Sequence, residues 1–84
     1  MVSATRIVAN YTTGSTGNIQ LAYENDGFTA VIAPIVSGSN AYLRAWLSMA
    51  NNHWYLTAVD PNSGATVNNT QLAVRFWVLK FARS

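Results

Sequence analysis

The chain has 84 residues, of which 50% are hydrophobic and only 10% charged, with a formal net charge of +2 and no cysteine. This length suits one domain spanning residues 1–84, and the lack of cysteine excludes disulfides, thiolate metal sites and a thiol nucleophile. The basic residues are scattered along the sequence, so they do not form the cluster of positive charge that nucleic-acid binding needs.

The segment MVSATRIVANYTT at 1–13 has no continuous apolar stretch, so we expect no signal peptide. No apolar run approaches the roughly 20 residues of a membrane-spanning helix, and we expect a soluble protein that does not bind membranes. A domain of this size without a disulfide is marginal as a monomer, which predicts oligomerisation.

Turn-forming residues recur about every ten positions, and the segments between them are rich in β-branched and aromatic residues. This spacing is typical of a small antiparallel β-sandwich or barrel. We predict an all-β domain of about six or seven strands, with the following bounds: 4–11, 18–24, 28–36, 41–49, 53–59, 65–68 (a short strand) and 70–81.

Asp26-Gly27 is a strong signal for a two-residue hairpin turn between the segments 18–24 and 28–36. If these segments pair across the turn, one face is apolar and the other mixed, as a sandwich layer requires. The predicted inner face consists of Ile19, Leu21, Tyr23, Ala30, Ile32 and Pro34. The predicted outer face consists of Gln20, Ala22, Glu24, Thr29, Val31 and Ala33.

Asn51-Asn52 predicts a second hairpin turn, because asparagine tolerates the left-handed backbone conformation that such turns need. The resulting register gives one wholly apolar face of three facing pairs: Met49 with Trp54, Leu47 with Leu56, and Ala45 with Ala58. The other face combines polar and aromatic residues: Tyr42, Arg44, Trp46, Ser48, Tyr55, Thr57 and Val59. Good helix formers in 41–50 favour a helix, but the agreement of the register favours strands.

The segment TQLAVRFWVLKF at 70–81 is the most apolar of the chain, and as a strand it has two mostly apolar faces. One face carries Leu72, Val74, Phe76 and Val78. The other carries Ala73, Arg75, Trp77, Leu79 and Phe81. Because the two hairpins already supply enough apolar surface for one core, we expect this second face to bind a neighbour. Arg75 is expected to meet a carboxylate or a backbone carbonyl there.

The sequence shows no catalytic signature, and we predict that the protein is not an enzyme. His53 is the single histidine, and it could form a Ser-His-Asp combination only with Ser48 and Asp60. Neither a nucleophile elbow nor a glycine-rich oxyanion loop accompanies these residues. Glu24 and Asp26 could act as paired carboxylates on a glycosidic bond, but carboxylates at turns more often cap backbone N–H groups.

The segment DPNSG at 60–64 resembles the start of a calcium loop, but the helical context and the terminal bidentate glutamate are missing. A plain β-turn explains these residues equally well, so we predict neither a metal nor a cofactor. The triplets beginning at Asn10 and Asn68 match the glycosylation pattern, which an Asn- and Thr-rich sequence produces by chance.

The strongest feature is a set of tyrosine, tryptophan and arginine residues, the types enriched at interface hot spots. The candidate binding residues are Tyr42, Arg44, Trp46, Tyr55, Arg75, Trp77, Leu79 and Phe81. They could line the core, form a subunit or partner interface, or stack on sugar rings beside hydrogen-bonding side chains. The core interpretation leaves one apolar face unexplained, so we favour the interface.

The Asn-, Thr- and Ser-rich turns and the ending GATVNNTQLAVRFWVLKF give the chain a resemblance to small, cysteine-free β-proteins of tailed bacteriophage particles. These are capsid cement proteins and tail or fibre components. The resemblance implies self-association into trimers or higher assemblies, attachment to a capsid or tail, and location in the virion after assembly in the host cytoplasm.

We therefore expect a non-enzymatic structural protein of the virion, a cement or tail-associated component. It would bind its own copies and a larger virion protein by burying apolar and aromatic side chains. The alternative is a small oligomeric lectin with carbohydrate sites built on tryptophan and tyrosine. An antitoxin-like or inhibitor role ranks third.

Overall fold

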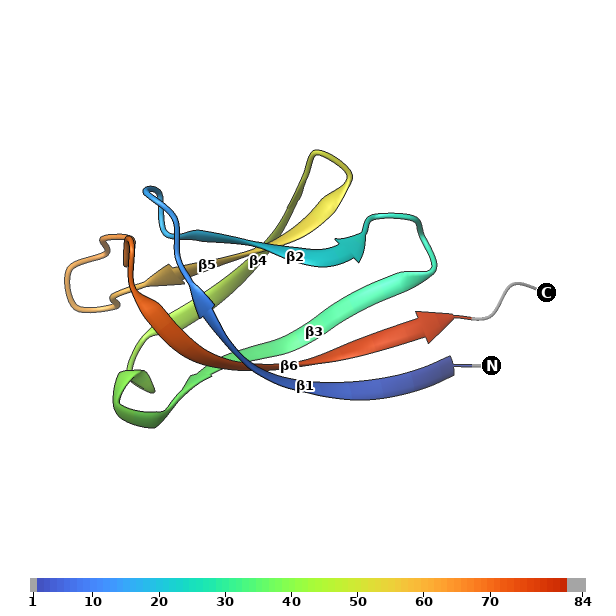
Figure 1. Cartoon of the computed structure of the whole chain (residues 1–84), viewed down its shortest axis with the longest axis horizontal. Helices are drawn as coiled ribbons and strands as arrows, with labels where there is room; N and C mark the ends of the chain where they lie inside the picture. The colour runs from blue at the N-terminus through green and yellow to red at the C-terminus, as the bar shows by residue number, and fades with distance from the viewer. Residues whose placement is uncertain (1, 82–84) are drawn as a thin grey trace.

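The computed structural model describes residues 2–81 of the chain. Over these residues it contains six strands and one 3₁₀ turn: β1 (Val2–Thr12), β2 (Asn18–Glu24), β3 (Thr29–Ser37), η1 (Gly38–Asn40), β4 (Arg44–Ala50), β5 (His53–Val59) and β6 (Gln71–Phe81). The strands form two three-stranded antiparallel sheets, in the orders β1-β6-β3 and β2-β5-β4 (Figure 1). The predicted small all-β sandwich is thus confirmed.

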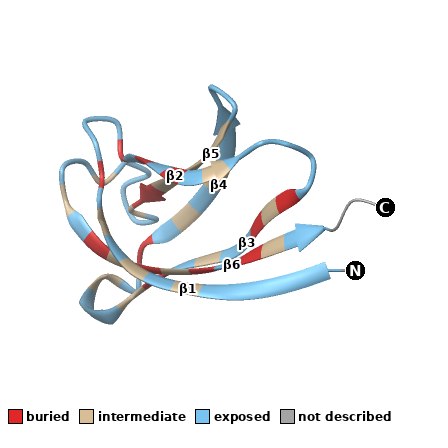
Figure 2. Cartoon of the chain, turned by 45° about the vertical axis from the view of Figure 1, so that its right-hand side comes forward, coloured by how far each residue is buried: buried red, intermediate tan, exposed pale blue. Residues whose placement is uncertain are grey.

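The core lies between the two sheets and takes alternate residues from each strand, as the pleat dictates. Its buried members are Ile19, Leu21, Val31, Val36, Leu43, Leu56, Ala58, Leu72, Val74, Phe76 and Val78. Phe76 is at its centre, with the Tyr11 ring centroid 6.4 Å away and the Tyr23 ring edge-on at 6.0 Å. Figure 2 shows the buried positions as red bands on the strands.

The hairpin predicted at Asn51-Asn52 is confirmed in its full register. β4 and β5 pair Ala45 with Ala58, Leu47 with Leu56 and Met49 with Trp54. Asn51 and Asn52 have φ angles of 50° and 62°, the left-handed conformation of the turn that matches strand twist. The segment 44–50 is accordingly a strand and not a helix.

The hairpin predicted at Asp26-Gly27 is wrong. β2 pairs with β5 and β3 pairs with β6, so 25–28 is a corner that carries the chain from one sheet to the other. Long-range bonds hold this corner: Asn25 N donates to Asn52 O at 2.9 Å, and Phe81 N donates to Phe28 O at 2.8 Å. Within it, Asp26 Oδ1 accepts from Phe28 N at 2.8 Å.

The inner face of β3 differs from the prediction for the same reason. Val31 and Val36 are buried, whereas Ile32 and Ile35 point outward beside β6. The register shifts between these two isoleucines, because Ala33 and Pro34 together lie opposite a single residue, Phe76. This is a β-bulge. Ala33 adopts a φ of 53°, and the missing N–H of Pro34 costs no ladder bond at such a position.

Two further predicted strands differ from the structure in detail. The short strand expected at 65–68 is reduced to an isolated bridge between Thr66 and Val59. The strand expected at 4–11 begins at Val2 and ends at Thr12.

Arg83, one of the basic residues of the sequence, lies outside the described residues.

The molecule is elongated, with extents of 45 × 26 × 18 Å. β1 and β6 have 11 residues each, whereas β2, β4 and β5 have seven. At about 3.3 Å per residue the long strands extend roughly 13 Å beyond the short ones. Val2 pairs with Phe81 at the tip of this extension, and Figure 2 shows the first part of β1 exposed.

The opposite end of the sandwich is closed by hydrogen bonds between the segments that follow β1 and precede β6. Thr13 N donates to Thr70 O at 2.9 Å, and Thr70 N donates to Thr13 Oγ1 at 3.0 Å. Gly17 packs so closely there that a Cβ would lie 2.7 Å from Thr66 Cβ, at a φ of 75°. One end of the fold is therefore fastened and the other projects.

Candidate functional site

The candidate binding residues fall into two groups on different sheets. Arg44, Trp46 and Tyr55 lie on β4 and β5, and Tyr42 precedes β4. The other group is on β6, and it consists of Arg75, Trp77, Leu79 and Phe81. Because the inner faces of the two sheets meet in the core, the strand residues of the two groups lie on opposite outer sides of the sandwich. They form two surfaces, not one.

The first surface is the outer side of the sheet β1-β6-β3, which we call the apolar face. It consists of Val2, Val8, Ile32, Ile35, Trp77, Leu79 and Phe81. Apart from half-buried Leu79, each of these side chains is between 41% and 61% exposed. Large exposed apolar side chains gathered on one sheet face are typical of interaction sites, so this face is a candidate for one.

The division of β6 into two faces is as the sequence predicts. Leu72, Val74, Phe76 and Val78 are all at most 3% exposed and belong to the core. The alternate residues face outward, so the interpretation that Trp77 lines the core is wrong. Arg75 is half-buried among these outward residues. Its Nε is buried and has no hydrogen-bond partner among residues 2–81.

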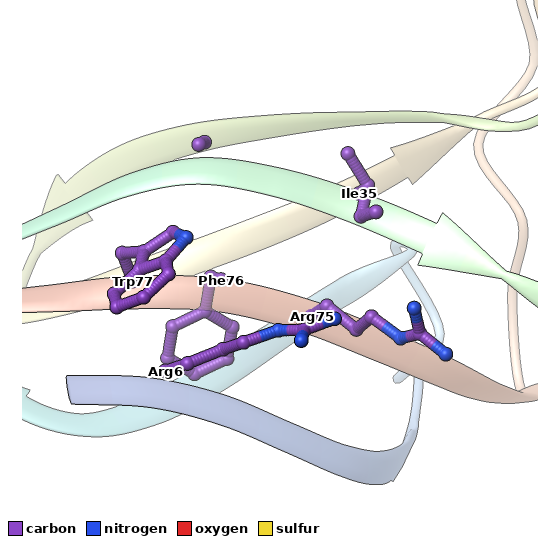
Figure 3. A pocket seen from close by; sticks show the side chains of 6 residues that line it. Arg6, Ile35, Arg75, Phe76 and Trp77 are labelled. Carbon is purple, nitrogen blue, oxygen red and sulfur yellow. The ribbon is translucent and has the colours of Figure 1, made fainter.

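A pocket of about 310 Å³ opens in the apolar face where β3 bulges away from β6. It is lined by Arg6, Ala33, Ile35, Arg75, Phe76 and Trp77. Figure 3 shows how three strands contribute: Arg6 comes from β1, Ile35 from β3, and Arg75 and Trp77 from β6. The pocket thus has apolar walls and two guanidinium groups.

The two arginines are neighbours by sheet geometry. Arg6 lies opposite Trp77, and Val8 lies opposite Arg75, so Arg6 and Arg75 are diagonal positions on one face. The Cβ atoms of such positions are about 7 Å apart, which lets both side chains reach one bound group.

None of the carboxylate side chains in residues 2–81 lies on the apolar face. Glu24 ends β2, Asp26 is in the corner at 25–28, and Asp60 follows β5. Within the described part of the chain neither Arg6 nor Arg75 forms an ion pair with them. The electrostatic potential at the pocket is therefore positive.

Arg6 was missed as a binding residue in the sequence. In a strand of period two, Arg6 shares a face with Val2 and Val8, and this signal was available. The sequence contains no signal for which strand lies beside β1, because the β1–β6 pairing joins segments that are far apart in the sequence. The bulge was signalled only by Pro34.

The second surface is the outer side of the sheet β2-β5-β4, which we call the polar face. Two rows of side chains cross it. Thr57 Oγ1 donates to Asn18 Oδ1 at 2.7 Å beside Trp46, and Tyr55 OH donates to Gln20 Oε1 at 3.1 Å beside Ser48. Trp46 is 62% exposed. This surface presents one indole ring next to amides and hydroxyls that are already hydrogen-bonded to each other.

The combination of Ser48, His53 and Asp60 is not assembled in the structure. His53 and Asp60 lie at opposite ends of β5, about 20 Å apart along an extended strand. The carboxylate of Asp60 accepts from Asn62 N at 2.9 Å and so stabilises its own turn. Among residues 2–81, no three His, Asp or Glu side chains cluster in a way that could hold a metal ion.

Asp26 likewise has a structural contact. Its hydrogen bond from the backbone N–H of Phe28 lowers the pKa of the carboxyl group. Burial, with a smaller contribution from Tyr23, raises the pKa of the Tyr11 phenol.

None of the helical turns in 2–81 is long and apolar enough to cross a membrane.

Comparisons with known proteins return no match: no family model, no curated protein and no solved structure matches this chain.

Proposed function

We propose that the chain is a non-enzymatic assembly protein that binds neighbouring protein through its apolar face. The observation that carries this proposal is the exposure of six large apolar side chains on one side of one sheet. Each large side chain that an interface removes from water contributes about 1.5–3 kcal/mol when fully buried. Association would thus rest on burial and not on a charge network.

The arrangement of charge favours some assemblies over others. Two copies related by a two-fold axis through the apolar face would bring Arg6 and Arg75 of both copies together without a carboxylate. Such a contact leaves charges buried and unpaired. A heterologous contact, in which the apolar face meets a different surface of the next copy, avoids this, and it forms a ring where the rotation between copies closes. A trimer is the smallest such ring and is our preferred oligomer.

The setting we propose is a virion of a tailed phage, with the chain as a capsid cement or tail-associated component that also attaches to a larger virion protein. The support is the resemblance of the sequence to such proteins, together with its small, cysteine-free β-fold and apolar face. Genes for capsid or tail proteins beside the coding gene would support this setting, and a location among unrelated metabolic genes would count against it.

The assembly is tested by light scattering coupled to size-exclusion chromatography over a range of concentrations. We expect a concentration-dependent oligomer that Trp77→Ser weakens about tenfold, since this exposed ring contributes on the order of 1–2 kcal/mol if buried. Trp46→Ser, on the polar face, is the matched control and should leave association unchanged. A clean monomer at micromolar concentration that does not associate when concentrated would overturn self-assembly.

A second candidate function is carbohydrate binding at the polar face. The observation in its favour is Trp46, which stands exposed beside Asn18, Thr57 and Tyr55 and could stack on a sugar ring. A glycan-array signal that Trp46→Ala abolishes with the fold intact would favour a lectin. A signal that persists in Trp46→Ala, or no signal at all, would reject this site.

A further inference from the structure

We propose that the pocket between Arg6 and Arg75 is the docking site for a carboxylate of the partner protein, an aspartate or glutamate side chain flanked by apolar side chains. This inference rests on the proposed function for the existence of a partner. It adds which chemical group of that partner the apolar face recognises.

The donors of the pocket call for an acceptor. Arg75 lines the pocket, and its Nε is buried with no hydrogen-bond partner among residues 2–81. A buried donor that stays unpaired is destabilising. An acceptor that binds Arg75 therefore gains more binding free energy than an acceptor that binds an exposed arginine. Arg6 lies diagonally across from Arg75 and can bind the same group from its other side.

The shape and lining of the pocket select a carboxylate. Its planar pair of oxygens fits the planar fork of a guanidinium, and this pairing suits partly buried sites. A phosphate group pairs with guanidiniums in the same way, but it carries more charge, which costs more to remove from water between apolar walls. The other walls, Ala33, Ile35 and Trp77, are apolar and provide no further donors from their side chains.

The size of the pocket points to a side chain and not to a cofactor. Its volume of about 310 Å³ is at the small end of the range of roughly 300–1,000 Å³ for ligand sites. Around it the apolar face continues over Val8 and Ile32, which are both exposed. A segment that places a carboxylate between two apolar side chains would cover both the pocket and its rim.

The charges also argue against the apolar face of a second copy as the occupant of the pocket. That face brings two more arginines and no acid, so the group that enters the pocket comes from a different surface. The occupant is therefore another copy of this chain, which presents one of its acidic side chains from a surface other than the apolar face.

The experiment measures peptide binding by NMR, using the Arg Nε–Hε resonances and the Trp77 indole N–H. The probes are acetyl-Leu-Glu-Leu-amide and acetyl-Leu-Gln-Leu-amide, which differ by one charge. We expect the Glu peptide to bind at least tenfold more tightly and to shift the Arg75 resonance. Arg75→Gln and Arg6→Gln should each weaken it about tenfold, the effect of a lost charge-assisted hydrogen bond. Arg44→Gln on the polar face is the matched control and should have no effect.

Four results would overturn the inference. The two peptides could bind equally, which would show a merely apolar pocket, or neither could bind. Inorganic phosphate could bind more tightly than the Glu peptide, which would make this a phosphate site. Finally, 3-phenylpropionate could bind where the Glu peptide does not, which would show a site for free small acids.

These outcomes separate the inference from the proposed function. If Trp77→Ser weakens association but no peptide binds, the assembly stands and the carboxylate site falls. If the Glu peptide binds in an arginine-dependent way to a chain that stays monomeric, self-assembly falls and the site stands.

Discussion

The two outer faces of this sandwich carry similar residues but in different environments. Each has an exposed tryptophan and an arginine: Trp77 and Arg75 on the apolar face, Trp46 and Arg44 on the polar face. On the polar face the neighbours of the tryptophan are hydroxyls and amides that bond each other across strands. On the apolar face Trp77 lies between Ile32 and Arg6, and the buried Nε of Arg75 lacks a hydrogen-bond partner within 2–81.

Residue type alone therefore does not identify an interface. A hydrogen-bonded row such as Tyr55 with Gln20 satisfies its own polar groups, so a protein partner gains little by covering it. Exposed isoleucine and valine side chains form no hydrogen bonds, and their removal from water by a partner is favourable. Of the two tryptophans, Trp77 is therefore the better candidate for an anchor of protein association, although Trp46 is the more exposed.

The strongest test of this difference puts a charge on each face. Ile32→Lys would place an unpaired ammonium group in the proposed interface, on the same face as two arginines. Because burying such a charge costs several kcal/mol, we expect association to fall by roughly a hundredfold or more. Ser48→Lys places the same charge on the polar face and should leave association unchanged. Sedimentation velocity measures both, and equal losses would mean that the two faces do not differ.

Removal of Arg75 is the next test. Arg75→Ala should weaken association about tenfold, as expected for a lost charge-assisted contact. The thermal midpoint of the monomer should change little, because Arg75 is on the outer side of β6 and forms no ion pair with any residue in 2–81. If association and midpoint fall together, Arg75 supports the fold itself and the interface role is wrong.

A smaller effect is expected from the polar face. Thr57→Val removes the hydroxyl that donates to Asn18 at 2.7 Å. We expect the free energy of unfolding to fall by about 0.5–1 kcal/mol, the range of one exposed hydrogen bond, with association unaffected. Chemical denaturation measures the first and light scattering the second. A loss of association would show that this row belongs to an interface after all.

The smallest effect is expected from Asp26, in the corner that joins the two sheets. Its pKa is lowered in the folded state by the bond from Phe28 N. The ionised Asp26 therefore stabilises the folded state at pH values above the pKa that this carboxyl group has in the unfolded chain. This contribution is lost as pH falls below about 4. We expect a shallow drop of the thermal midpoint there that Asp26→Asn removes. The same drop in Asp26→Asn would assign it to Glu24 or Asp60.

What the sequence predicts well depends on local pairing. Asn51-Asn52 joins neighbouring strands, and its register follows from the alternation of 45–49 and 54–58 alone. The alternation of β6 likewise separates core from surface. Asp26-Gly27 carries an even stronger turn signal, yet it makes a corner, because β5 and β6 compete for β2 and β3 as partners.

The pocket could not be predicted for a similar reason. It needs Arg6 from one end of the sequence, Arg75 from the other, and the bulge at Ala33 between them. Sequence periodicity places Arg6 and Arg75 each on a face of its own strand, but only the strand order brings those faces together. Tests of the site therefore depend on contacts between residues that are distant in the sequence.

The position of β6 in the middle of its sheet has a consequence for biosynthesis. β1 and β3 have no hydrogen-bonded contact with each other and meet only through β6, which the ribosome makes last of the six strands. Neither can complete its sheet before β6 has been made, and such late, long-range pairing slows folding. The apolar face does not exist until that point, so premature association through it is avoided until synthesis has passed Phe81.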